Sequence, residues 1–243
     1  MNEIQVQTEI IKLPSKGLVY PEGNPLASGE IEMKYMTAKE EDILLNQSYI
    51  KNGTAIDRLI KSMIVTKINY EDLVTGDKNA LMVSARILGY GEMYTFVYNG
   101  EEHTVDLSEL DAKPLDESQF VKGTNEFEYV LPHTKTKVTF KLLTHKDESN
   151  IERELEGLKK IYKDNIPELS TRMKHLITSV NGERDSKVIR EFVDHHLLAR
   201  DSKALRKHIK DFQPDVDLTF FPDGDSNRVN IPIGIRFFWP DFE

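Results

Sequence analysis

Polar and apolar positions follow regular spacings along the chain, and a change of spacing marks the first predicted elements. Residues 30–36 alternate polar and apolar side chains, which is the period of a half-buried strand. Thr37 follows, with Glu40 three residues later, and this spacing is that of a capping box at the start of a helix. We therefore predict a strand that leads directly into a helix through Leu45.

The first part of the chain continues with more elements of both kinds. They are a helix over 55–64 with Ile56, Leu59, Ile60 and Met63 on one face, a helix over 75–91 that begins near Asp77, and a hairpin over 93–107 that turns at Asn99–Gly100. Before the first strand, residues 10–30 contain three prolines and three glycines, which predicts a loop-rich lead-in.

A second series of similar elements begins after a polar stretch at 113–125. It comprises a pair of strands over 127–144, a long helix over 148–163, a helix over 171–180, helices over 185–212, and strands over 216–239 around a turn at Asp223–Gly224.

The two series also match residue by residue. A shift of 107 residues takes 31–41 onto 138–148, so that Thr37 falls on Thr144. Leu13-Pro14 matches Leu131-Pro132, and residues 59–63 match 176–180 at a shift of 117. A further match, at a shift of 124, takes Asp77, Ala80, Leu81, Thr95 and Phe96 onto Asp201, Ala204, Leu205, Thr219 and Phe220. Because the shift grows in steps, as insertions would make it, we interpret the pattern as an internal duplication. The alternative is that similar strand and cap signals occur independently in each half.

A duplication predicts the fold, because one such unit is too small to bury a core securely by itself. We expect an α+β fold of two tandem related units, each a β-hairpin, two or three helices and a second hairpin, packed as a bilobal body with pseudo-two-fold symmetry. The first unit, with its extended lead-in, is assigned to 1–112 and the linker to 113–125. The second unit, which ends in an aromatic strand, is assigned to 126–243.

Composition narrows the classes of function. The chain has 32 Lys and Arg against 41 Asp and Glu, a net charge of −9, and this disfavours general binding to nucleic acid. It contains no cysteine, which removes disulfides and thiolate metal sites. No apolar run is long enough for a membrane span, and the first residues lack the features of a signal peptide. We expect a soluble protein of a cytoplasm.

A search for catalytic and metal-binding patterns gives no candidate. No Gly-rich phosphate loop with a following Lys-Ser/Thr occurs, and neither does a G-x-S-x-G or H-E-x-x-H pattern. His195 and His196 point about 100° apart on a helix, so they cannot easily share one ion. Residues 223–227 begin like a calcium loop, but Arg228 stands where that loop needs glycine. We therefore predict no catalytic, cofactor-binding or metal-binding residue.

Two apolar segments are candidates for partner binding. Four aromatic residues lie near the C-terminus: Phe237, Phe238, Trp239 and Phe242. The first interpretation is a last strand that holds these rings in the core, and the alternative is a tail that docks on a partner, since aromatic residues concentrate at interface hot spots. The lead-in adds four residues that either lie along a neighbouring subunit or cover their own hairpin: Leu13, Pro14, Leu18 and Tyr20.

Four segments together resemble the baseplate hub proteins of T-even-like contractile-tailed bacteriophages. They are "LPSKGLVYPEG", "EIEMKYMTAKEEDIL", "TGDKNALMVSARILGYG" and "IPIGIRFFWP", and the resemblance covers nearly the whole chain. It implies a non-enzymatic tail protein that takes part in assembling or forming the baseplate hub. The implied partners are other hub or tail subunits, with self-association left open. The implied locations are the host cytoplasm during assembly and the baseplate of the virion.

The chain departs from its relatives at the hairpin tips. Related sequences often carry Cys-x-x-Cys there, whereas this chain has Asn99–Gly100 and Asp223–Gly224, so no zinc is expected. The alternative to the hub function is an enzyme with a site between the two lobes. Buried carboxylates or histidines with shifted pKa values in an inter-lobe cleft would favour that alternative.

Overall fold

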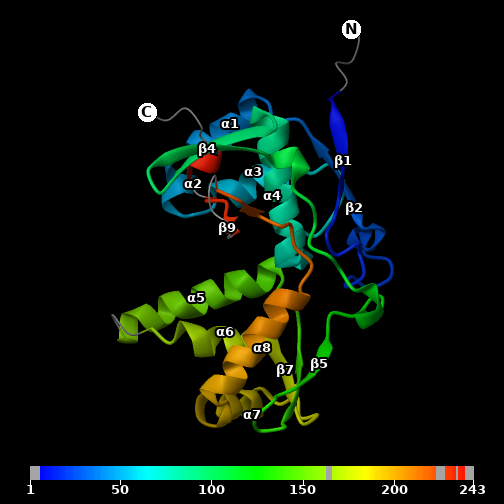
Figure 1. Cartoon of the computed structure of the whole chain (residues 1–243), viewed down its shortest axis with the longest axis vertical. Coiled ribbons are helices and arrows are strands. Elements are labelled where there is room, and N and C mark those ends of the chain that lie inside the picture. The colour runs from blue at the N-terminus through cyan, green and yellow to red at the C-terminus, as the bar shows by residue number, and fades with distance from the viewer. Residues whose placement is uncertain (1–5, 163–165, 223–227, 234, 239–243) are drawn as a thin grey trace.

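The computed structural model describes residues 6–162, 166–222, 228–233 and 235–238. The chain has the predicted α+β fold, and its helices and small antiparallel sheets form two lobes stacked along the long axis (Figure 1). The strands are β1 (Thr8–Lys12), β2 (Glu30–Lys34), β3 (Met93–Tyr98), β4 (Glu101–Asp106), β5 (Phe127–Val130), β6 (Lys137–Phe140), β7 (Ile177–Val180), β8 (Thr219–Phe220) and β9 (Val229–Asn230). The α-helices are α1 (Ala38–Leu45), α2 (Gln47–Lys51), α3 (Ala55–Met63), α4 (Thr75–Tyr90), α5 (His145–Tyr162), α6 (Glu168–Leu176), α7 (Ser186–Glu191), α8 (Ala199–Phe212) and α9 (Ile235–Phe238).

The upper lobe in Figure 1 is built around α4. The hairpin β1–β2 lies on one side of this helix and the hairpin β3–β4 on the other (Figure 1). Two predictions are confirmed here. Thr37 and Glu40 form a capping box at the start of α1, and Asn99 and Gly100 turn between β3 and β4 with φ of 51° and 87°, the left-handed values that a two-residue hairpin turn requires.

The lower lobe contains a sheet of order β5-β6-β7 that packs with α5, α6 and α8. The predicted helix over 171–180 is wrong in its second half, because α6 ends at Leu176 and residues Ile177–Val180 form β7. Val180 pairs with Val138 of β6, and both side chains are buried. The spacing of Leu176, Ile177 and Val180 suits either a helix or a strand, so the pairing with β6 decides the conformation.

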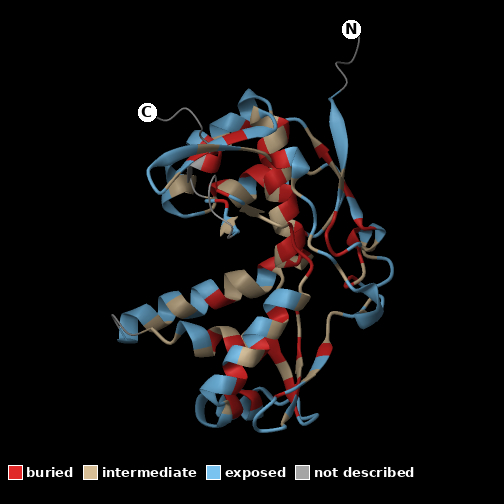
Figure 2. Ribbon diagram, in the orientation of Figure 1, coloured by how far each residue is buried: buried red, intermediate tan, exposed pale blue. Residues whose placement is uncertain are grey.

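A single apolar core extends through both lobes. Buried residues of the upper lobe, such as Leu81 and Leu73, belong to the same cluster as Phe140 and Leu205 of the lower lobe. Figure 2 shows the buried positions along α4 and around α8, whereas most of α5 is exposed or half-buried. The proposed division into units at 113–125 stays a prediction.

The first hairpins of the two halves have the same register. A shift of 118 on the first strand and of 107 on the second takes the pair Ile11–Ile31 onto the pair Tyr129–Val138. The same shifts account for each of the other pairs in β5–β6. The two hairpins therefore share a register over four pairs, and they differ in the length of the loop between their strands. The pseudo-two-fold arrangement of the halves stays a prediction.

The helix positions support one of the proposed sequence matches and contradict another. α4 begins at Thr75 and α8 at Ala199, which is the predicted shift of 124. The match at a shift of 117 is wrong, because it would place helical residues 59–63 on strand β7. A shift of 113 residues instead takes the whole of α3 onto α6. The C-cap residue is then an isoleucine in both helices, Ile64 after α3 and Ile177 after α6.

The end of the described chain returns to the upper lobe. After α8, the described residues 216–222 pass back to the hairpin β3–β4, where the ring of Phe220 lies 4.9 Å from that of Phe96. The predicted strand over 228–239 is correct only at β9, because Ile235–Phe238 form the short helix α9. The turn expected at Asp223–Gly224 lies outside the described residues.

Candidate functional site

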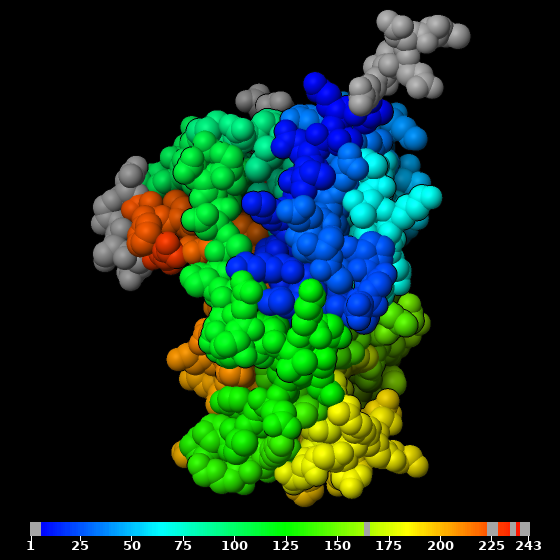
Figure 3. Space-filling view, turned by 90° about the vertical axis from the view of Figure 1, so that its right-hand side faces the viewer, coloured from blue at the N-terminus to red at the C-terminus, as the bar shows by residue number. Residues whose placement is uncertain are grey.

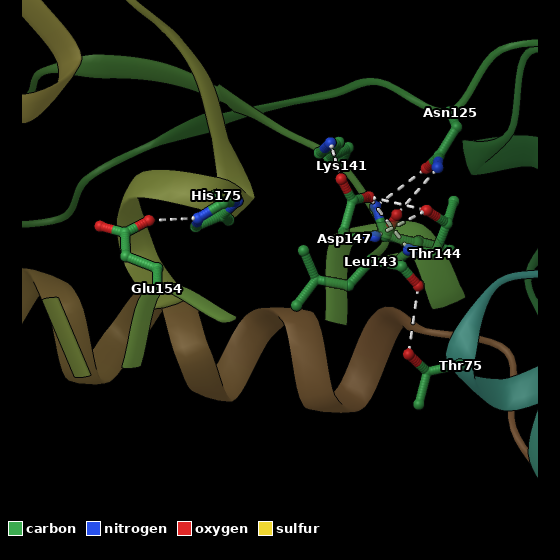
Figure 4. Close-up of polar contacts among 9 residues, drawn as sticks. Thr75, Asn125, Lys141, Leu143, Thr144, Asp147, Glu154 and His175 are labelled. Carbon is green, nitrogen blue, oxygen red and sulfur yellow. Dashed lines mark hydrogen bonds and ion pairs between the residues drawn. The ribbon is translucent and has the colours of Figure 1, made fainter. Parts of the chain in front are cut away.

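The two lobes are joined where the segments before α4 and α5 run side by side. We call residues 73–75 and 143–145 the lobe junction. Val74 and Thr144 form an antiparallel bridge, and the backbone N–H of His145 donates to the carbonyl oxygen of Leu73 at 2.8 Å. The N–H and the hydroxyl of Thr75 both donate to the carbonyl oxygen of Leu143, at 3.0 and 3.1 Å (Figure 4). These bonds fix the start of α5 against the start of α4.

A cluster of ionisable side chains lies beside this junction. Asp57 of α3 is its centre: it accepts a hydrogen bond from the Tyr70 hydroxyl at 2.9 Å and forms an ion pair with Lys78 at 2.6 Å. His145 is the first residue of α5, and its Nε2 lies 3.9 Å from both Asp57 and Glu71. The cluster therefore joins side chains from α3, α4 and α5 across the two lobes.

The contact with Lys78 determines which ring nitrogen of neutral His145 carries the proton. Lys78 Nζ lies 3.3 Å from Nδ1 of His145, and an ammonium group can only donate, so Nδ1 accepts. The proton of the neutral ring is then on Nε2, which faces the carboxylates of Asp57 and Glu71. Burial lowers the pKa of His145, and the charge of Lys78 lowers it further. The ring is therefore neutral at neutral pH.

The partners of this histidine also have shifted pKa values. Burial alone would raise the pKa of Asp57, but the charge and the hydrogen bond of Lys78 outweigh burial and hold the pKa below its usual range. Burial and the neighbouring Asp57 raise the pKa of Tyr70 far above its usual value. The ion pair of Asp57 and Lys78 lies within the upper lobe, and His145 brings the start of α5 against it through the contact of its Nδ1 with Lys78.

A second polar arrangement occurs at the strand-to-helix turn of each lobe. In the upper lobe Glu40 accepts from Lys34 at 2.8 Å, from the Thr37 hydroxyl at 2.6 Å and from the Ser62 hydroxyl at 2.7 Å. Burial would raise the pKa of Glu40, but these donors lower it to about 2. The charged carboxylate is thus strongly preferred in the folded chain.

The lower lobe repeats this arrangement at a shift of 107 residues. Asp147 accepts from Lys141 at 2.6 Å and from the Thr144 hydroxyl and backbone N–H at 3.0 and 3.1 Å (Figure 4). The matched sequence signals at Thr37 and Thr144 therefore correspond to matched contacts. In both lobes the acidic side chain starts a helix and is bound by the chain itself.

A third pair of acidic residues lies in the first turn of α4 and of α8. Asp77 accepts from the backbone N–H of Ser15 at 2.9 Å and from the hydroxyls of Ser15 and Tyr20, both at 2.6 Å. Asp201 accepts from the backbone N–H groups of His133 and Thr134 at 2.9 and 3.1 Å. Each aspartate binds the segment that follows a Leu-Pro pair. Asp77 was expected near the helix cap, and its carboxylate instead holds the lead-in.

The residues predicted to bind a partner lie mostly in the chain's own core. Those that are buried are Leu13, Pro14, Tyr20, Phe237 and Phe238, whereas Leu18 is half-buried and Trp239 and Phe242 lie outside the described residues. Phe237 packs edge-on to Tyr94 with ring centroids 5.0 Å apart. For these two phenylalanines the position agrees with the interpretation that the rings are held in the core, although in a helix and not in a strand.

Two further histidines, His175 and His208, contact other side chains. His175 bonds Glu154 at 2.9 Å (Figure 4), and His208 stacks on Tyr129 with ring centroids 4.5 Å apart. Within the described part of the chain, no group of three or more His, Asp or Glu side chains is placed to hold a metal ion. Over the same residues, no helix has both the length and the apolar character needed to cross a bilayer.

Sequence reasoning missed the Asp57 cluster. Its members are Asp57, Tyr70, Lys78 and His145, and the last of these is 88 residues from the first in the chain. No spacing rule links residues that far apart, since they meet only through the bridge at the lobe junction. The junction brings together the starts of α4 and α5, which are not matched positions of the two series, so the sequence matches gave no signal for the cluster.

Fold and site together define an α+β protein of two lobes joined by a partly buried polar cluster. Comparison with known proteins adds no family: no family model, no curated protein and no solved structure matches the chain.

Proposed function

We propose that the chain is a non-enzymatic tail protein of a contractile-tailed bacteriophage that takes part in assembling or forming the baseplate hub through protein–protein contacts. The resemblance of its sequence motifs to that family supports the proposal. The supporting structural observation is that three acidic groups, Glu40, Asp77 and Asp201, are each buried and bound to the chain itself. Their chemistry is used to fix the fold.

Large apolar side chains on the surface support a contact function further. On the upper lobe Ile10, Met93 and Val97 are each more than half exposed. On the lower lobe Ile161 at the end of α5 and Val121 are 72% exposed. Met93 and Val97 lie four residues apart on β3 and share its exposed face, where they offer apolar surface to a partner.

Co-purification tests the proposal directly. The chain is co-expressed with each baseplate hub and tail-tube subunit of its phage, and the mixtures are resolved by size-exclusion chromatography. We expect the chain to elute with at least one hub subunit. A chain that elutes alone in every mixture would contradict the hub function. Mass spectrometry of purified virions against infected-cell lysate then distinguishes a hub component from an assembly factor.

The Asp57 cluster favours a second candidate, an enzyme with a site between the lobes. His145 and Asp57 have shifted pKa values and come from different lobes. The change His145→Gln keeps a hydrogen-bonding side chain of similar size but cannot exchange a proton. If this variant unfolds at the same denaturant concentration as the parent chain but a phage that carries it fails to form plaques, proton chemistry is favoured. Normal plaque formation would exclude the enzyme hypothesis.

A further inference from the structure

Each lobe has a groove beside one of the two helices that match at a shift of 124 residues, α4 in the upper lobe and α8 in the lower lobe. The groove of the upper lobe lies between β1 and α4 and has a volume of about 470 Å³. Its lining includes Glu9 and Ile11 of β1 and Ser84, Ile87 and Leu88 of α4. We call it the β1–α4 groove. Figure 3 shows the strand β1, in deep blue, lying on the surface of the molecule.

The lower lobe has a groove at the equivalent helix positions. A shift of 124 residues takes Ser84, Ile87 and Leu88 onto His208, Asp211 and Phe212, and these three residues line a smaller groove of about 250 Å³. The hairpin register takes Glu9 of β1 onto Phe127 of β5. Phe127 does not line the smaller groove, but its ring packs on Phe212 with centroids 4.6 Å apart. The helix positions of the two grooves therefore correspond, whereas their other walls differ.

In the lower lobe an aromatic side chain from a preceding segment fills this place. The ring of Phe120 stacks on Phe212 with centroids 4.8 Å apart and planes 11° apart. It also packs edge-on to Phe127 at 5.3 Å. Phe120 comes from the short stretch 114–120, which itself lines the groove. A segment with one aromatic residue is thus the occupant that this groove accepts within the molecule.

The upper groove is larger and has no counterpart of Phe120 in the sequence. The shift of 118 that relates the hairpins takes Phe120 back to Asn2, and residues 1–5 include no aromatic residue. Ile87 and Leu88 are half-buried and buried in the described chain, and they provide the apolar floor.

The rim of the β1–α4 groove is acidic. Glu9 and Glu92 both line it, and no Lys or Arg is among its described lining residues. The Tyr35 hydroxyl donates to Glu9 at 2.6 Å. This hydrogen bond and the charges of Glu9 and Glu92 raise the pKa of Tyr35. The groove thus combines an apolar floor with two carboxylates that have no Lys or Arg beside them among the described lining residues, and it favours an occupant with a positive charge.

We propose that the β1–α4 groove binds an extended segment of another protein that places one aromatic side chain on Ile87 and Leu88 and a lysine or arginine beside Glu9 and Glu92. The occupant plays the part that Phe120 and its neighbours play in the lower lobe. The inference names a contact surface for the proposed hub function and therefore rests on that function.

The test uses two groove variants and two matched controls of the full chain. Ser84→Trp fills the floor of the groove, and the double change Glu9→Lys with Glu92→Lys reverses the charge of its rim. Ser186→Trp and Glu22→Lys make similar changes at exposed positions elsewhere. Far-ultraviolet circular dichroism establishes that each variant is folded. Each variant is then titrated with every purified hub and tail-tube subunit that binds the parent chain, with isothermal calorimetry as the readout.

We expect each groove variant to bind at least one such subunit about tenfold or more weakly, and the controls to bind within about twofold of the parent chain. Because the chain has no cysteine, a photo-crosslinker attached at Ser84→Cys labels a single site. The crosslinked peptide of the subunit should contain an aromatic residue and a lysine or arginine.

The outcomes separate the two proposals. If every subunit that binds the parent chain binds both groove variants equally, the groove proposal is overturned and the hub function stands. If the crosslinked peptide lacks an aromatic or a basic residue, the proposed chemistry of the occupant is wrong. If no subunit binds the parent chain, the hub function fails, and the groove proposal fails with it.

Discussion

Buried carboxylates in this chain accept hydrogen bonds that hold backbone segments in place, and the pKa of each carboxylate depends on the hydrogen-bond donors around it. Asp77 and Asp201 hold equivalent places in the first turns of α4 and α8, yet their pKa values shift in opposite directions. Burial raises the pKa of Asp77 and outweighs its hydroxyl donors. Burial would also raise the pKa of Asp201, but the backbone N–H groups of His133 and Thr134 outweigh it and lower the pKa. Equivalent positions therefore respond differently to acid.

Glu40 gives a prediction at the residue scale. Its pKa in the folded chain is about 2, below the unfolded value, so its contribution to stability is fully present above about pH 5 and is lost as the pH falls toward about 2. The change Glu40→Gln should lower the free energy of unfolding by about 2–3 kcal/mol at neutral pH and should flatten its decline below about pH 5. Urea denaturation between about pH 7 and pH 3 measures both effects.

The control for this change is Asp42→Asn in the same helix. Asp42 is exposed, and surface substitutions usually change stability by less than about 0.5 kcal/mol. Equal losses for the two variants would show that the contacts of Glu40 contribute nothing specific.

At the scale of the element, a close approach of two backbone segments requires a glycine in the first turn of α4. A Cβ added to Gly76 would lie 1.8 Å from the carbonyl oxygen of Pro214, which follows α8. The equivalent residue in α8 is Arg200, where no such approach is needed. Gly76 thus marks the point where the chain leaving α8 crosses the start of α4.

Gly76→Ala should therefore destabilise the chain, although alanine is the better helix former. We expect a loss of about 1–3 kcal/mol in the free energy of unfolding, because the backbone must move to admit the methyl group. Gly157→Ala in α5 is the control, since nothing lies within 4 Å of its added Cβ. That variant should gain about 0.5–1 kcal/mol. Chemical denaturation of both variants checks the pair, and a stabilised Gly76→Ala would contradict the clash.

Elements with local signals were predictable from the sequence, and elements that depend on distant contacts were not. The capping box at Thr37 and the turn at Asn99–Gly100 are each specified within a few residues. The strand Ile177–Val180 is specified by its pairing with β6, about forty residues earlier, so its local pattern was read as a helix. The Asp57 cluster depends on the lobe junction and had no local signal for the same reason.

At the scale of the whole molecule, the shared apolar core, the backbone bonds of the lobe junction and the Asp57 cluster all join the two lobes. Lys78 is central to that cluster, because it pairs with Asp57 and also contacts His145. Its positive charge lowers the pKa of His145 and lowers that of Asp57. The lobe contact and the ionisation of the histidine are therefore linked.

Lys78→Met should raise the pKa of His145, because removal of a neighbouring positive charge favours the imidazolium form. It should also cost about 1–2 kcal/mol of stability, since Asp57 keeps its burial but loses its ion pair. Nuclear magnetic resonance titration of the His145 ring protons measures the shift. A lower pKa in the variant would contradict the assigned contact.

A second prediction at this scale concerns the return of the chain to the upper lobe. Phe237 is fully buried against Tyr94. Phe237→Ala should destabilise the chain by about 3–5 kcal/mol, whereas Phe221→Ala, at a position 57% exposed, should have little effect. Thermal unfolding followed by circular dichroism compares them. A small effect of Phe237→Ala would show that the upper lobe is complete without the returning segment.

The return of residues 216–238 to the upper lobe affects the order of events during synthesis. The hairpin β3–β4 leaves the ribosome about 130 residues before Phe237, a delay on the order of ten seconds at ordinary translation rates. During that interval Tyr94 and Phe96 lack the rings that cover them in the folded chain. The lower lobe, whose strands and helices lie within 127–212, can fold first. The upper lobe is therefore completed last, although most of its residues are synthesised first.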